Sequence, residues 1–123
     1  MAHTQNYEDI VIPQGTDTAI ELHLVKESDG TAFDLTNYSA AAKMKRNYND
    51  SADDPNTVAF NAIIPTPATS GIVTLSLTSD SSATLQTRGR YVYDVEVSFV
   101  DSSSNTIVQR VAEGQIEVTP SVT

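Results

Sequence analysis

The strongest constraint on the fold is the alternation of apolar and polar side chains over residues 90–100, RYVYDVEVSFV. Every second residue from Tyr91 to Phe99 is large and apolar, whereas the residues between them include Asp94 and Glu96. Because successive side chains of a β-strand point to opposite faces, this spacing predicts a strand with one buried and one wet face. Burying each large side chain contributes roughly 1.5–3 kcal/mol, so we expect this strand to cross the middle of a sheet.

The same period of two recurs in shorter stretches separated by polar turn residues, and helical spacing is nearly absent. The predicted strands cover residues 7–12, 18–24, 39–47, 57–64, 72–78, 90–100, 106–112 and 115–119. The side chains expected to face the core from the other segments are Ile20, Leu22, Leu24, Phe33, Leu35, Ala40, Ala42 and Met44. Residues 79–85 predict one helical turn, capped by a serine or aspartate, that places Ala83 and Leu85 on the core.

These elements predict a single all-β domain over residues 1–123, an immunoglobulin-like antiparallel β-sandwich of about seven or eight strands with at most one short helical turn. The segment LQTRGRY, residues 85–91, resembles the tyrosine corner of such sandwiches. We therefore expect the Tyr91 ring to be buried and its hydroxyl to reach the upstream backbone. Residues 1–9 and 119–123 are polar, and we expect extended arms there.

Charge and composition exclude several classes of partner and chemistry. The chain has 16 acidic and 7 basic residues and a formal net charge of −9, so phosphate backbones and anionic membrane surfaces would repel it. We expect neither nucleic acid nor membrane as a partner. Cysteine is absent, which removes disulfides and thiolate chemistry and suits a reducing cytoplasm. Residues 1–9 have no feature of a secretion signal, so we interpret the sequons at Asn37 and Asn49 as chance.

The possible chemical sites are few. Asp94 and Glu96 project from one strand face and could form a carboxylate pair, although a solvated outer face explains them better. His3 and His23 lack any metal-ligand spacing, and the dispersed glycines form no phosphate-binding loop. The acidic segments 50–54 and 101–105 fit no calcium pattern. We therefore predict no catalytic residue, no metal ligand and no cofactor.

Five segments together resemble the small β-sandwich domains of tailed-bacteriophage virion proteins, especially the N-terminal domain of baseplate upper proteins and single-domain tail or neck components. The segments are QGT at 14–16, DG at 29–30 with FDLT at 33–36, SGIVTL at 70–75, GRYVYDV at 89–95 and GQIEVTP at 114–120. The resemblance is one of pattern, over about residues 10 to 120. It carries over no catalytic residue.

This resemblance implies a non-catalytic structural protein that is assembled in the bacterial cytoplasm and joins a symmetric virion in several copies. Its partners would be other virion proteins and copies of itself. A capsid decoration protein is an alternative placement. A binding module for glycans or cell surfaces is an alternative of another class, with Tyr7, Tyr38 and Tyr48 as a stacking platform. An enzyme with an unrecognised site is the third.

Overall fold

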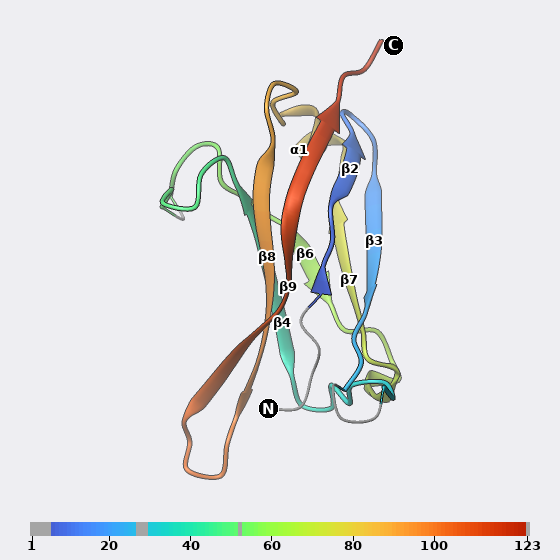
Figure 1. The fold of residues 1–123 in the computed structure, drawn as a ribbon, viewed down its shortest axis with the longest axis vertical. Helices are drawn as coiled ribbons and strands as arrows, with labels where there is room; N and C mark the ends of the chain where they lie inside the picture. Colours follow the sequence, from blue (N-terminus) through green and yellow to red (C-terminus); the bar gives the residue numbers. More distant parts are fainter. Residues whose placement is uncertain (1–5, 27–29, 52, 123) are drawn as a thin grey trace.

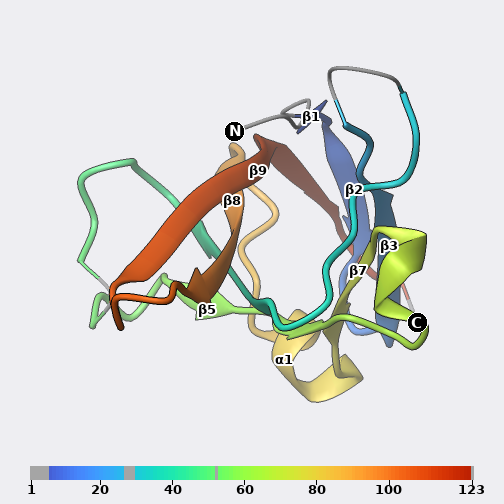
Figure 2. The same cartoon turned by 90° about the horizontal axis from the view of Figure 1, so that it is seen from below.

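Two β-sheets pack face to face around one hydrophobic core in the computed structural model, which describes residues 6–26, 30–51 and 53–122 (Figure 1). The strands are β1 (Asn6–Tyr7), β2 (Ile10–Pro13), β3 (Thr18–His23), β4 (Ser39–Lys45), β5 (Val58–Ala59), β6 (Asn61–Ile63), β7 (Ile72–Leu77), β8 (Tyr91–Val100) and β9 (Thr106–Thr119). The larger sheet has six strands in the order β1-β9-β8-β4-β5, with β2 also on β9, and the smaller has the order β3-β7-β6. Figure 2 shows the two layers from one end. The predicted all-β, immunoglobulin-like sandwich is confirmed.

The core contains the side chains that the period of two predicts. Tyr91, Tyr93, Val95 and Val97 of β8 are buried, and Phe99 is half-buried. From the other segments, the buried predicted residues are Leu22, Leu24, Phe33, Leu35, Ala42 and Met44, and Ile20 and Ala40 pack against the same cluster. None of the described helices is long and apolar enough to cross a bilayer.

The predicted helical turn is α1 (Ser79–Ala83). The structure also contains a short 3₁₀ turn, η1 (Ala68–Ser70). The cap of α1 is Thr78, whose hydroxyl accepts a hydrogen bond from the Ser81 N–H. The prediction for Ala83 was wrong, because Ala83 is exposed and Ser82 is buried in the position expected for it. The Ser82 hydroxyl donates to the Thr16 carbonyl at 2.7 Å, and this bond satisfies its polar atom inside the protein.

Tyr91 forms the predicted tyrosine corner. Its side chain is 2% exposed, and its hydroxyl accepts a hydrogen bond from the Gln86 N–H at 2.9 Å. The guanidinium carbon of Arg46 lies 5.0 Å from the centre of the ring, within the range of a cation–π contact. Tyr91 therefore ties the connection before β8 to the core, and its role is structural.

β9 is one continuous strand where two strands were predicted, and it contains a β-bulge. Val95 pairs with Ala112 and the next residue, Glu96, pairs with Arg110, so Val111 is the extra residue. Both Val111 and Ala112 are fully buried. The extra residue reverses the alternation of the strand, so that after the bulge Ile116 and Val118 face the core.

The N-terminal strands run parallel to β9, in contrast to the antiparallel pairing elsewhere in the sandwich. Asn6 and Tyr7 pair with Ala112 and Glu113, and residues 10–13 pair with residues 116–119. The predicted strand over 7–12 is interrupted between these two pairings, where Glu8 donates its N–H to the Glu113 carbonyl at 3.0 Å. The predicted N-terminal arm is thus docked on the chain's own β9 from residue 6 onward, and residues 1–5 lie outside the described part.

Gly114 and Tyr93 hold this interruption in place. The carbonyl of Glu8 passes directly over Gly114, where a Cβ atom would overlap it. The Tyr93 hydroxyl donates to the same carbonyl at 2.7 Å, and the Gln115 N–H donates to the Asp9 carboxylate at 3.2 Å. At the other end of β2, the Gln14 N–H donates to the Thr119 carbonyl at 2.9 Å. The predicted C-terminal arm over 119–123 therefore begins at the last residue of β9, Thr119, which is hydrogen-bonded to Gln14. Residue 123 lies outside the described residues.

We expect the free energy of unfolding to fall as the pH rises above about 10. Burial, with the nearby Glu8 and Asp9 carboxylates, raises the pKa of the Tyr93 hydroxyl well above its usual value of 10.0. In this window the unfolded tyrosine loses its proton while the folded one keeps it, so ionisation stabilises the unfolded state. Denaturant titrations at stepwise pH should give a shallower decline for Tyr93→Phe than for wild type. If stability declined equally steeply with pH in both proteins, the raised pKa of Tyr93 would not be the cause of the decline.

Candidate functional site

The face of the large sheet that points away from the core carries charged side chains in cross-strand rows. The register places Lys43 of β4 beside Asp94 of β8, and Asp94 beside Glu113 of β9. A second row consists of Ala41, Glu96 and Arg110. Side chains in register on one face are close enough to interact, so these strands assemble a single polar surface.

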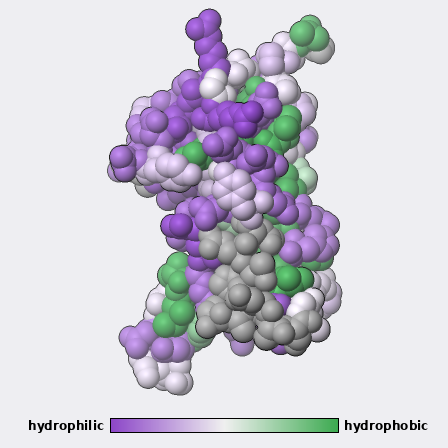
Figure 3. Space-filling model, viewed as in Figure 1, coloured by the Kyte–Doolittle hydropathy of each residue, from purple (hydrophilic) through white to green (hydrophobic). Residues whose placement is uncertain are grey.

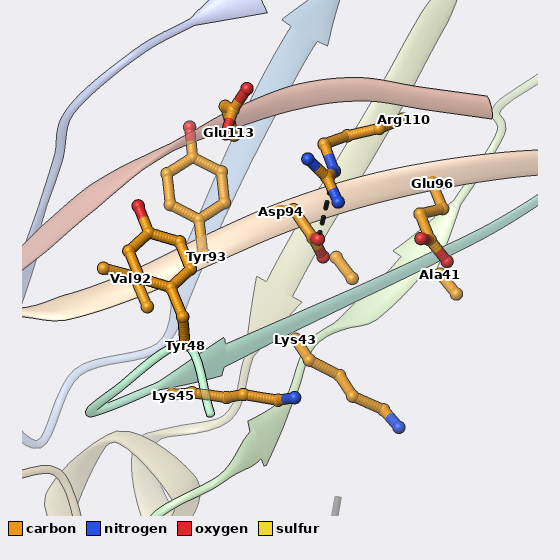
Figure 4. A pocket seen from close by; sticks show the side chains of 11 residues that line it. Ala41, Lys43, Lys45, Tyr48, Val92, Tyr93, Asp94, Glu96, Arg110 and Glu113 are labelled. Carbon is orange, nitrogen blue, oxygen red and sulfur yellow. Dashed lines mark ion pairs between the residues drawn. The ribbon is translucent and has the colours of Figure 1, made fainter. Parts of the chain in front are cut away.

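This surface is hollowed into a groove of about 330 Å³ (Figure 4). The groove is lined by Ala41, Ala42, Lys43, Lys45, Tyr48, Val92, Tyr93, Asp94, Glu96, Arg110 and Glu113. Ala41 and Val92 contribute apolar surface to it, and Tyr48, at 73% exposed, comes from the segment after β4. Its basic and acidic side chains balance, in contrast to the net charge of −9 over the chain.

The bulge in β9 brings Arg110 and Glu113 onto the same face. Residues three apart on a regular strand point to opposite faces, but the extra Val111 corrects the parity. Arg110 then lies close to Asp94, with 3.4 Å between its Nε and the carboxylate Oδ2 (Figure 4). A local irregularity of the backbone thus creates the ion pair of the groove.

We expect Asp94→Asn to change the free energy of unfolding by no more than about 0.5 kcal/mol. Both partners of the ion pair are about half exposed, so solvent screens their attraction. The measurement is a denaturant titration of both proteins at low and moderate salt. A loss several times larger would mean that Asp94 stabilises the groove through more than this ion pair.

The sequence-predicted carboxylates Asp94 and Glu96 do project from one face of β8, as expected from their spacing. Both are only partly buried, and both line the open groove. Asp94 contacts Arg110, and Glu96 lies in register with that same arginine. The arrangement offers charged groups of both signs to a bound molecule at an open surface.

The three tyrosines of the predicted glycan platform do not form one surface. Tyr38 packs against Phe33 and Phe99, with ring centres 5.6 and 5.0 Å away, and belongs to the core margin. Tyr7 and Tyr48 are both exposed. Of these, only Tyr48 lines the groove.

The acidic segments considered for calcium use their carboxylates to shape their own loops. Asp101 accepts hydrogen bonds from the N–H groups of Ser103 and Asn105, both at 2.9 Å. Asp50 accepts in the same way from Asn47 at 3.0 Å. Within the described ranges, no three acidic or histidine side chains come together as a metal site. His23 lies 3.4 Å from Glu21 on an exposed face of β3, and His3 lies outside the described residues.

The groove was not predicted from the sequence. Its basic residues, Lys43, Lys45 and Arg110, could be placed on outward faces by their alternation, but their meeting depends on the register between β4, β8 and β9. The one feature of the sequence near the groove that could have drawn attention to this part of β9 is Gly114. An isolated glycine inside a strand pattern indicates a bulge or a close approach of another backbone, and here it marks the approach of Glu8.

Comparisons with known proteins support the fold. No family model matches the chain, and no curated protein matches its sequence. Among solved structures, murine CRIg is similar over 91% of this chain and 92% of its own, at 15% identity and a TM-score of 0.51. AggA, the major subunit of aggregative adherence fimbriae type I from Escherichia coli, matches over 95% and 93% at 13% identity, with a TM-score of 0.38. At such low identity the likeness to CRIg concerns the fold alone: this chain is an immunoglobulin-like sandwich.

Proposed function

We propose that this chain is a non-catalytic structural subunit of a tailed-bacteriophage virion, located in the tail, baseplate or neck and assembled in the bacterial cytoplasm. It acts through contacts with other virion proteins and with copies of itself. The proposal starts from the resemblance of its strand and turn segments to virion β-sandwich domains. The structural observation that supports it is the open groove, lined by charges of both signs, on the outer face of the large sheet.

That face has the properties of a protein-binding surface. The groove is open. Two segments project from the sandwich, the connection from β4 to β5 and the β8–β9 hairpin (Figure 1). Its equal numbers of basic and acidic side chains allow another acidic protein to approach a chain whose net charge is −9. A catalytic carboxylate usually works in surroundings that exclude water, whereas Asp94 and Glu96 line an open surface.

Mass spectrometry of purified virions tests the proposal. Particles of the phage that encodes this chain should contain it at a constant ratio to the major capsid protein through successive gradient purifications. A ratio far below that of the capsid protein supports the tail, baseplate or neck, and a comparable ratio supports capsid decoration instead. Absence of the chain from particles that are otherwise complete would overturn the proposal.

Tyr48 favours one alternative function, a glycan-binding module. An exposed aromatic ring beside carboxylates is the combination that binds sugars by stacking and hydrogen bonding. A glycan array probed with the isolated chain tests this alternative, with Tyr48→Ala as the site variant and Tyr7→Ala as the matched control outside the groove. Binding that only Tyr48→Ala abolishes would support the module.

A further inference from the structure

The charges of the groove are sorted by strand. Two basic residues, Lys43 and Lys45, lie along β4. Two acidic residues, Asp94 and Glu96, lie along the neighbouring strand β8. A basic row and an acidic row of equal charge therefore run side by side on the outer face of the large sheet.

Three of these four charged groups have no partner of their own. Within the described part of the chain, the side chains of Lys43, Lys45 and Glu96 form no ion pair or hydrogen bond. Figure 4 shows Lys43 pointing away from Asp94, whose carboxylate faces Arg110. Lys45 and Glu96 are nevertheless partly buried. A partner with matching charges would pair groups that are already partly removed from water.

The same face continues as uncharged surface toward the β8–β9 hairpin. Ser39, Ser98 and Val108 form the row next to the charged ones. Val108 is 55% exposed and Val100 is 66% exposed, and in Figure 3 hydrophobic residues gather on the arm of the projecting hairpin. A contact that covers the groove and this surface would therefore also remove apolar area from water, which favours association.

We propose that two copies of this chain associate face to face through the outer faces of their large sheets, related by a two-fold axis that runs along the strands between β4 and β8. This axis lays β4 of each copy over β8 of the other, with the strands nearly aligned as packed sheets prefer. The residues that come opposite each other follow from the register: Lys43 and Asp94, Ala41 and Glu96, Lys45 and Val92.

The arrangement of the charges selects this axis. An axis across the strands, centred on the groove, would lay β8 over itself and bring the carboxylates of Asp94 and Glu96 together. An axis along β8 would place Asp94 against Asp94. The axis between β4 and β8 instead forms two Lys43–Asp94 pairs, and no like charges meet in these three rows.

The self-complementary rows favour a second copy as the partner. A two-fold contact sets a surface against itself, so a face of one charge would repel its copy, whereas two rows of opposite charge attract. In a chain with a net charge of −9, such a balanced region is where a second copy can approach. The contact deepens the proposed function and rests on it for the expectation of several copies in one particle.

The test is the association state of the purified full chain, measured by sedimentation equilibrium over a series of protein and salt concentrations. Wild type should show a reversible monomer–dimer equilibrium that weakens as salt rises. Lys43→Glu and Asp94→Lys each set like charges opposite each other and should each weaken the dimer at least about tenfold. Lys26→Glu is the matched control, because it makes the same charge change in the connection after β3, outside the groove. It should leave the dimer unchanged.

Mixing the two variants locates the contact. In a mixed dimer of Lys43→Glu with Asp94→Lys, both contacts join opposite charges again, so an equimolar mixture should dimerise about as tightly as wild type. Recovery between two chains cannot arise within either one. If circular dichroism shows that Asp94→Lys does not fold, Ala41→Glu replaces it as the second variant, since it faces Glu96 of the second copy and should weaken the dimer.

Three results would overturn the contact. They are a wild type that stays monomeric at every concentration, folded variants that dimerise as tightly as wild type, and a mixture that dimerises no better than its components.

The two proposals fail separately. A chain that forms this dimer but is absent from virions removes the proposed function and leaves the contact. A chain that is present in virions but monomeric in solution removes the contact and leaves the function.

Discussion

Tyr91→Ala is expected to lower the free energy of unfolding by about 4 kcal/mol, a large share of the 5–15 kcal/mol typical of a domain. The substitution leaves a cavity where a ring that is 2% exposed now packs. It also removes the acceptor of the Gln86 N–H and the ring beneath the Arg46 guanidinium. Denaturant titration followed by circular dichroism measures the loss.

Two further variants separate the contributions at this position. Tyr91→Phe keeps the ring and removes only the hydroxyl, so it should cost about 1 kcal/mol. Tyr48→Ala removes an exposed tyrosine and should stay within about 0.5 kcal/mol of wild type. If Tyr91→Ala were as mild as Tyr48→Ala, the tyrosine corner would not anchor the connection before β8.

Gly114→Ala is expected to cost about 3 kcal/mol and to detach the N-terminal strands from β9. The added methyl group would overlap the Glu8 carbonyl, which also accepts the hydrogen bond of Tyr93. Because backbone atoms rather than a flexible side chain occupy the space, β1 and the start of β2 must move away. Amide exchange should show loss of protection at residues 10–12 before the core strands lose theirs.

Gly15→Ala is the control for the general cost of replacing a glycine. Gly15 has a φ of +81° and no neighbouring atom where the methyl would lie, so only backbone strain of about 1 kcal/mol is expected. A double-mutant cycle adds a second test. Tyr93→Phe should cost less in the Gly114→Ala background than in wild type, since the bond to Glu8 is already lost there. Full additivity would show that the two residues act independently.

The sequence predicted the parts of the fold that depend on local periodicity. The apolar face of β8 and the anchors Phe33 and Leu35 follow from side-chain alternation and turn spacing alone. The corner at Tyr91 could be predicted because the tyrosine and its partner are only five residues apart.

The features that escaped prediction depend on contacts between distant segments. The parallel pairing of β2 joins residues that are 106 positions apart, such as Ile10 and Ile116, and nothing in either segment specifies the direction of pairing. Ser82 is buried and Ala83 is exposed because the Thr16 carbonyl accepts a hydrogen bond from the Ser82 hydroxyl inside the protein. The groove could not be foreseen, because the bulge that brings Arg110 and Glu113 onto its face is a mismatch between β8 and β9 and not a property of either strand.

The parallel ladder between β2 and β9 has a mechanical consequence. Tension applied between residues 6 and 119 pulls these two strands along their axes in opposite directions. All the ladder bonds over residues 10–13 would then be sheared at once, whereas an antiparallel hairpin opened from its end unzips one bond at a time. A sandwich of this topology should therefore resist stretching through its ends, which is a useful property for any part that must stay intact while its neighbours move.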